Sequence, residues 1–62
     1  MADTPLQKAV IQNNIAVVYM EQKHYKQAIQ LLTALSQSPI VQNNLEHQAR
    51  VLDNLGFCYF KI

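Results

Sequence analysis

Cysteine is nearly absent from this 62-residue chain, which contains only Cys58. One cysteine cannot close an internal disulfide, and the two histidines, His24 and His47, do not complete a ligand cluster for structural zinc. A domain of this size buries only about 60% of its unfolded surface, so it needs a crosslink, a partner or very regular helix packing. Regular helix packing and binding to a partner therefore remain as the sources of stability. We expect no metal and no cofactor.

Charge is also scarce, because charged residues make up 15% of the chain against 50% hydrophobic residues. This balance excludes a disordered chain, and the formal net charge of +1 gives no electrostatic footprint for nucleic acid or an anionic membrane. The longest apolar run, residues 15–20, is far shorter than the roughly 20 residues that span a bilayer. A single free cysteine fits a reduced compartment, so we expect a cytoplasmic location.

The residue types that commonly catalyse reactions are not spaced in a pattern that indicates an active site. The four acidic residues are scattered, and no glycine-rich phosphate loop is present. Both histidines are expected to be solvated surface residues. The sequence therefore predicts that the chain is not an enzyme.

One glycine and two prolines are too few for the many turns of an all-β chain, so the sequence predicts an all-α fold. A first helix is expected over residues 5–22, where Thr4 and Gln7 form a capping box and Pro5 suits the first helical position. Its apolar residues recur at three- and four-residue spacing. They are Leu6, Val10, Ile11, Ile15, Val18 and Tyr19.

Two further helices are expected over residues 25–36 and 44–62. The second carries Tyr25, Ala28, Ile29, Leu31, Leu32 and Leu35, and the third carries Leu45, Ala49, Leu52, Leu55, Cys58 and Tyr59. Asn43 and Glu46 have capping-box spacing before the third helix. That helix has no stop signal, which suggests a chain cut from a longer protein. The predicted architecture is one domain, with an antiparallel helical hairpin followed by a third helix.

The first and third predicted helices contain similar segments. Residues 14–19 are Asn-Ile-Ala-Val-Val-Tyr, and residues 54–59, at an offset of 40, are Asn-Leu-Gly-Phe-Cys-Tyr. This order indicates an internal repeat. The tiny residue, Ala16 or Gly56, lets a neighbouring helix backbone approach closely. Cys58 corresponds to Val18, so it is expected to be a small buried hydrophobic residue, with a reactive thiol as the less favoured alternative.

These residues resemble the tetratricopeptide repeat, in which a first helix carries a Leu-Gly-x-x-Tyr core and a second helix carries an alanine nine residues after that tyrosine. Tyr19 and Ala28 have this spacing, and the resemblance covers residues 9–62, about one and a half repeats. The signature positions correspond to Ile15, Ala16, Tyr19, Tyr25, Ala28, Leu32 and Leu35, and then to Leu52, Leu55, Gly56 and Tyr59.

The departures from the family pattern are specific. Lys23 stands where the family usually has a glycine, and Pro39 comes one residue before the usual closing proline. The period is 40 residues rather than about 34. A longer period is similar to the extended repeats of kinesin light chains and of bacterial repeat-containing regulators and peptide sensors. The resemblance implies the start of an α-α superhelix.

The resemblance also implies a role for two asparagines. In the longer-period relatives, the asparagine before the Leu-Gly core clamps the backbone of an extended peptide on the concave face formed by the first helices. Asn14 and Asn54 match that position. A side-chain amide can donate to one peptide carbonyl and accept from one N–H. The alternative is that each asparagine caps or crosslinks neighbouring helices.

A second stripe is expected beside these asparagines at helical spacing. Its exposed apolar residues suit an adaptable partner-binding surface, although the favoured alternative for so short a chain is that missing repeats or another chain cover them. The stripe comprises Asn13, Val17, Met20 and Glu21 in the first helix and Asp53, Phe57, Phe60 and Lys61 in the third.

The sequence therefore predicts a scaffold module that binds an extended peptide or a protein partner. Two alternatives remain: a self-association segment, and the N-terminal sensing part of a bacterial regulator. The third helix favours self-association, because the face bearing Leu52, Leu55, Gly56 and Tyr59 needs a cover. We expect a homo-oligomer in which a second copy pairs two-fold through this helix or exchanges it about residues 37–43.

Overall fold

The computed structural model describes residues 4–62, which form four α-helices and contain no strand. The helices are α1 (Pro5–Glu21), α2 (Tyr25–Ser36), α3 (Pro39–Gln42) and α4 (Leu45–Lys61). The predicted all-α class is confirmed, and the three long helices lie within one residue of their expected bounds. The short α3 was not predicted. Pro39 fixes the backbone at its start, and Val41 turns into the core.

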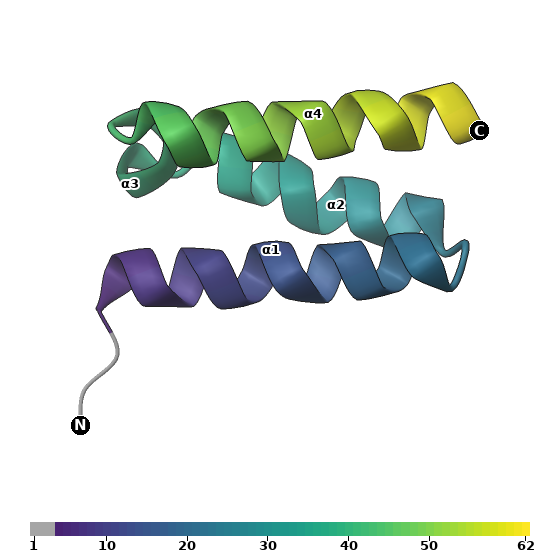
Figure 1. The fold of residues 1–62 in the computed structure, drawn as a ribbon, viewed down its shortest axis with the longest axis horizontal. Coiled ribbons are helices and arrows are strands. Elements are labelled where there is room, and N and C mark those ends of the chain that lie inside the picture. The colour runs from purple at the N-terminus through teal and green to yellow at the C-terminus, as the bar shows by residue number, and fades with distance from the viewer. Residues whose placement is uncertain (1–3) are drawn as a thin grey trace.

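Figure 1 shows that α1 and α4 run in the same direction, while α2 runs back between them. α2 packs extensively against both neighbours, whereas α1 and α4 share few direct contacts. The antiparallel pairing of the first two helices therefore matches the expectation from sequence. α3 lies at the end where α2 connects to α4 and contacts both α4 and α1.

Side-chain caps define the starts of α1 and α4. The Thr4 hydroxyl accepts a hydrogen bond from the Gln7 N–H at 3.1 Å, and the Gln7 side chain accepts from the Thr4 N–H at 3.0 Å, which confirms the predicted capping box. The predicted box at Asn43 and Glu46 is wrong. Asn44 caps α4 instead, by accepting from the His47 N–H at 3.2 Å. The backbone of Asn43 already serves to end α3, and this places the cap one residue later.

The turn between α1 and α2 depends on Lys23. Its φ of 64° lies in the left-handed region. The Lys23 N–H donates to Met20 O at 3.0 Å and the His24 N–H to Tyr19 O at 2.8 Å, a Schellman motif that satisfies the last carbonyls of α1. The position where the repeat family usually has glycine thus has the glycine-type conformation in this chain, although the residue is lysine.

Small side chains dominate the core. Among residues 4–62 the buried ones are Ala9, Ala16, Ala28, Leu32, Leu35, Val41, Val51 and Cys58. Ala16 and Ala28 are completely buried, so the backbones of α1 and α2 approach closely. The predicted burial of Cys58 is confirmed. Burial raises the pKa of the Cys58 thiol, which disfavours the reactive thiolate.

The predicted inner stripe of α1 is largely wrong. Ile11, Ile15 and Val18 are between 44% and 49% exposed, and Leu6 is also exposed. The buried side of α1 instead carries Ala9 and Ala16, with the half-buried residues Asn13, Val17 and Met20 at its border. Apolar residues surround nearly the whole of α1, so periodicity alone does not select a face. The face with Ala9 and Ala16 is the buried one because its small side chains permit the closest approach of α2.

α2 buries the expected side, whereas α4 does so only in part. Ala28, Leu32 and Leu35 of α2 are in the core. In α4, Val51 and Cys58 are buried, but several members of the predicted stripe are exposed. The principal extents of the fold are 35 × 23 × 15 Å. Because one helix with its side chains is about 10–12 Å wide, so thin an arrangement cannot cover both sides of α4.

The alanine contact between α1 and α2 predicts a steric test. Ala16→Leu should lower the free energy of unfolding by about 1 to 3 kcal/mol, because added methylenes do not fit between the two backbones. Ala34→Leu is the matched control at an exposed position of α2 and, at a protein concentration low enough for the chain to be a monomer, should change stability by less than about 0.5 kcal/mol. Urea unfolding measures both. Equal stability of the two variants would contradict close packing at Ala16.

The left-handed backbone at Lys23 gives a second prediction. That conformation costs about 1 to 2 kcal/mol for a residue with a Cβ. Lys23→Gly should therefore raise the free energy of unfolding by about 0.5 to 1 kcal/mol, after the greater flexibility of glycine in the unfolded chain offsets part of the gain. Lys26→Gly removes the same charge inside α2 and should destabilise by up to about 1 kcal/mol. Thermal or urea unfolding that shows destabilisation by Lys23→Gly would refute the argument.

Candidate functional site

The α1 and α4 stripes predicted to bind a partner meet at a pair of asparagines. Asn54 Nδ2 donates a hydrogen bond to Asn13 Oδ1 at 3.1 Å, and both side chains are half-buried. The bond joins two helices that otherwise share few contacts. Because α1 and α4 are parallel, this pair aligns the stripe that follows Asn13 with the one that follows Asn54. We call this surface the α1/α4 face.

Aromatic side chains lie toward the C-terminal end of the α1/α4 face. The ring of Phe57 packs edge to face against Tyr25, with centroids 6.4 Å apart and an interplanar angle of 60°. Lys61 Nζ lies 5.5 Å from the centroid of Phe57 and 5.9 Å from that of Phe60. Val17 and Met20 of α1 are half-buried, so they present part of their apolar surface. Tyr25 was not among the predicted site residues. Its aromatic side chain at the start of the second helix was the one sequence feature that could have indicated a place in this cluster.

The remaining predicted site residues are exposed. Glu21, Asp53 and Phe60 are exposed on their helices. Asn14 is also exposed, whereas Asn54 is engaged with Asn13. The two asparagines that match in the internal repeat thus have different surroundings. A crosslink between neighbouring helices does occur, and it uses Asn13 rather than Asn14.

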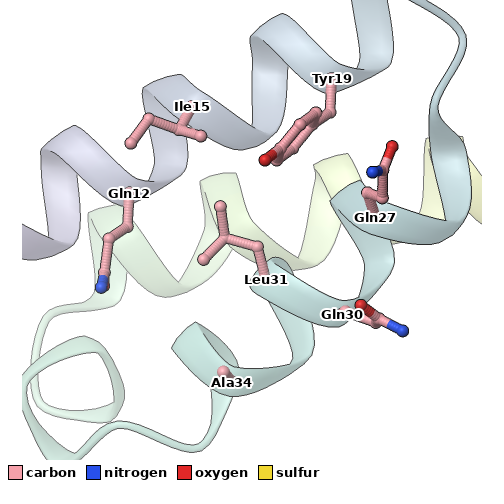
Figure 2. Close-up of a pocket in the computed structure, with 7 residues that line it drawn as sticks. All are labelled: Gln12, Ile15, Tyr19, Gln27, Gln30, Leu31 and Ala34. Carbon is pink, nitrogen blue, oxygen red and sulfur yellow. The ribbon is translucent and has the colours of Figure 1, made fainter.

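A second surface lies between α1 and α2 (Figure 2). It is an open groove of about 570 Å³ with no charged lining residue, and we call it the α1/α2 groove. Figure 2 shows apolar side chains of α1 and α2 along the groove, with glutamines among them. The lining residues are Gln12, Ile15, Tyr19, Gln27, Gln30, Leu31 and Ala34. Sequence reasoning missed this groove because it placed Ile15 in the core.

A third surface is an exposed line of residues on α4, spaced alternately by four and three. We call it the α4 ridge, and it comprises Leu45, Ala49, Leu52, Gly56 and Tyr59. Leu45, Leu52 and Tyr59 are 79%, 51% and 59% exposed. Nothing lies within 4 Å of the position that a Cβ at Gly56 would occupy. The face predicted to need a cover is therefore uncovered in this chain, except for the half-buried Leu55.

Among the titratable groups of residues 4–62, Arg50 Nη2 and Glu46 Oε1 of α4 form an exposed ion pair at 3.0 Å. His24 is exposed before α2, with its ring 6.5 Å from that of Tyr19, and His47 is half-buried in the first turn of α4. Within residues 4–62, His, Cys, Asp and Glu side chains form no group of three or more that could hold a metal ion. Over the same residues, no helix combines the length and apolar character required to cross a membrane.

Comparison of the chain with protein-family models, with curated proteins and with solved structures gives no match. The likeness to tetratricopeptide repeats remains a prediction based on the residues named above.

The pair of Asn13 and Asn54 predicts a measurable coupling energy. Alanine at each position and at both gives a double-mutant cycle, and the hydrogen bond should appear as about 0.5 to 1.5 kcal/mol of coupling in urea unfolding. The change in helix propensity from asparagine to alanine cancels in the cycle. Asn14→Ala combined with Asn54→Ala is the control and should be additive. Additivity in the Asn13 cycle would show that the pair contributes no stability.

Proposed function

We propose that the chain is a protein-interaction module that binds an extended segment of a partner along the α1/α4 face. The observation that supports this most directly is the placement of two parallel helices with a polar pair and an aromatic cluster on one shared surface. Asparagine amides can bond a peptide backbone, while Phe57 and Met20 offer adaptable apolar contacts. The resemblance to tetratricopeptide repeats implies the same use of the first helices.

The charge distribution suits a partner that is held by contacts at short range. Lys61 sits over two aromatic rings, so a partner carboxylate near it would meet a cation whose position is restrained. With a formal net charge of +1, the chain exerts little attraction at long range. Binding through this face should therefore depend weakly on ionic strength and strongly on the aromatic residues.

Selection from a phage-displayed library of random linear peptides, followed by titration of the selected peptides, tests this proposal. Phe57→Ala should weaken binding about tenfold, equivalent to about 1.4 kcal/mol, because aromatic residues often dominate interface energies. Tyr59→Ala removes an exposed aromatic residue from the other side of the same helix and should leave peptide affinity unchanged. Failure to select any peptide, or a loss of affinity only with Tyr59→Ala, would overturn the proposal.

Self-association is a second candidate function, and the exposure of the α4 ridge favours it. Each large apolar side chain that becomes fully buried stabilises a complex by about 1.5 to 3 kcal/mol. Burying several of them is a substantial gain for a small domain with little core. Sedimentation equilibrium over a wide concentration range tests it. A folded monomer of 7.1 kDa persisting at high micromolar concentration would exclude it.

A further inference from the structure

We propose that copies of this chain associate head to tail, with the α4 ridge of one copy lying in the α1/α2 groove of the next. This inference deepens the self-association proposed above and rests on it. It differs from the two-fold pairing expected from the sequence. In two-fold pairing the same surface of both copies is in contact, whereas here the α4 ridge of one copy contacts the α1/α2 groove of the other. The ridge is a convex line of side chains on one helix, and the groove is a hollow between two helices.

The positions of the two surfaces follow from helix geometry. Successive residues are rotated by about 100°, so residues two apart point in nearly opposite directions. Asn13 faces α4 through its bond to Asn54, and Ile15 therefore faces away from α4, into the groove. By the same reasoning, Asn54 faces α1 and Leu52 faces away from it. Groove and ridge thus lie on opposite sides of the molecule and cannot cover each other within one chain.

The shapes of the two surfaces are compatible. The α1 side of the groove, from Gln12 to Tyr19, extends over about 10 Å at the rise of an α-helix. That length accommodates the centre of the ridge, where Leu52 stands between Ala49 and Gly56. Because these two neighbours are small and the space at Gly56 is open, the backbone of α4 can approach the groove closely.

The charges beside the two surfaces are complementary. Lys8 lies one helical turn before Gln12, and Lys26 lies one turn before Gln30, so basic side chains border the groove. Asp53 directly follows Leu52, so an acidic side chain borders the centre of the ridge. Glu46, which follows Leu45, is instead paired with Arg50 of the same helix at 3.0 Å. Head-to-tail docking brings opposite charges together. A two-fold pairing centred on Leu52 would instead place the two copies of Asp53 close to each other, which is unfavourable.

Head-to-tail contact has a consequence for the size of the assembly. Each copy keeps a free groove at one end and a free ridge at the other, so addition of further copies continues unless a ring closes. The mean mass of the wild-type chain should therefore rise beyond that of a dimer as concentration increases. A two-fold dimer would stop at twice the monomer mass of 7.1 kDa.

Two variants that block one surface each provide the test. Leu52→Glu blocks the ridge and Ala34→Glu blocks the groove, and both positions are exposed, so the fold is retained. Circular dichroism and thermal unfolding verify the fold. In sedimentation velocity at a concentration where the wild type associates, each variant alone should be a monomer. A mixture of the two should form a 1:1 complex that grows no further, because one intact groove then meets one intact ridge.

The alternative outcomes separate this inference from self-association itself. A wild type that remains monomeric overturns both. If the wild type associates and Ala34→Glu alone still forms a dimer, self-association stands and the contact is ridge to ridge. If the mixture of variants stays monomeric while the wild type associates, another surface holds the copies together. The last two results each overturn head-to-tail docking.

Discussion

The close approach of α2 to α1 and α4 is the constraint on which the rest of the structure depends. Ala16 and Ala28 lie at the α1 and α2 contact, and Cys58 and Val51 of α4 complete the same core. Apart from Leu32 and Leu35 of α2, the buried side chains are alanine, valine or cysteine, so the stability of the core depends strongly on short distances between helices and dense packing. A larger side chain at Ala16 would separate backbones along the whole hairpin.

A core of small residues forces larger apolar side chains to the outside. Ile15 and Val18 of α1, and Leu45 and Leu52 of α4, are exposed because the positions nearest α2 are occupied by smaller residues. Scattered surface hydrophobic residues are ordinary, but here they follow helical rows on two sides of a thin molecule. The exposure of these apolar rows is thus a consequence of how the core is built.

Sequence periodicity predicted the long helices well and their buried faces poorly. Pro5, Thr4 and Gln7 mark the start of α1 unambiguously, because each satisfies a requirement of a helix N-terminus that is local in the chain. The buried face of α1 is not a local property. Apolar residues lie almost all round that helix, and only the position of α2 determines that Ala16 is buried and Ile15 is not. The cap of α4 was misplaced for a related reason, since two adjacent asparagines offer the same side chain.

Of the candidate site, the α1 and α4 stripes were predictable and the hydrogen bond within them was not. Helical spacing alone places Asn13 and Val17 on one side of α1, and Asn54 and Phe57 near one side of α4. The pairing of Asn54 with Asn13 rather than Asn14 depends on the rotation of both helices about their axes, which the packing on α2 fixes. The α1/α2 groove could not be predicted from the sequence, because it depends on how α1 and α2 are placed relative to each other.

The two interpretations of the asparagines, helix crosslink and peptide contact, are compatible in chemical terms. One amide hydrogen bond contributes about 1 kcal/mol to stability, and α1 and α4 are otherwise joined mainly through α2. Exchanging the bond between Asn13 and Asn54 for bonds to a peptide backbone would therefore leave the core intact. Each amide has both a donor and an acceptor group, so the exchange need not leave either side chain without a partner. The weakest contact between the long helices is thus also the one whose polar groups are best suited to binding a backbone.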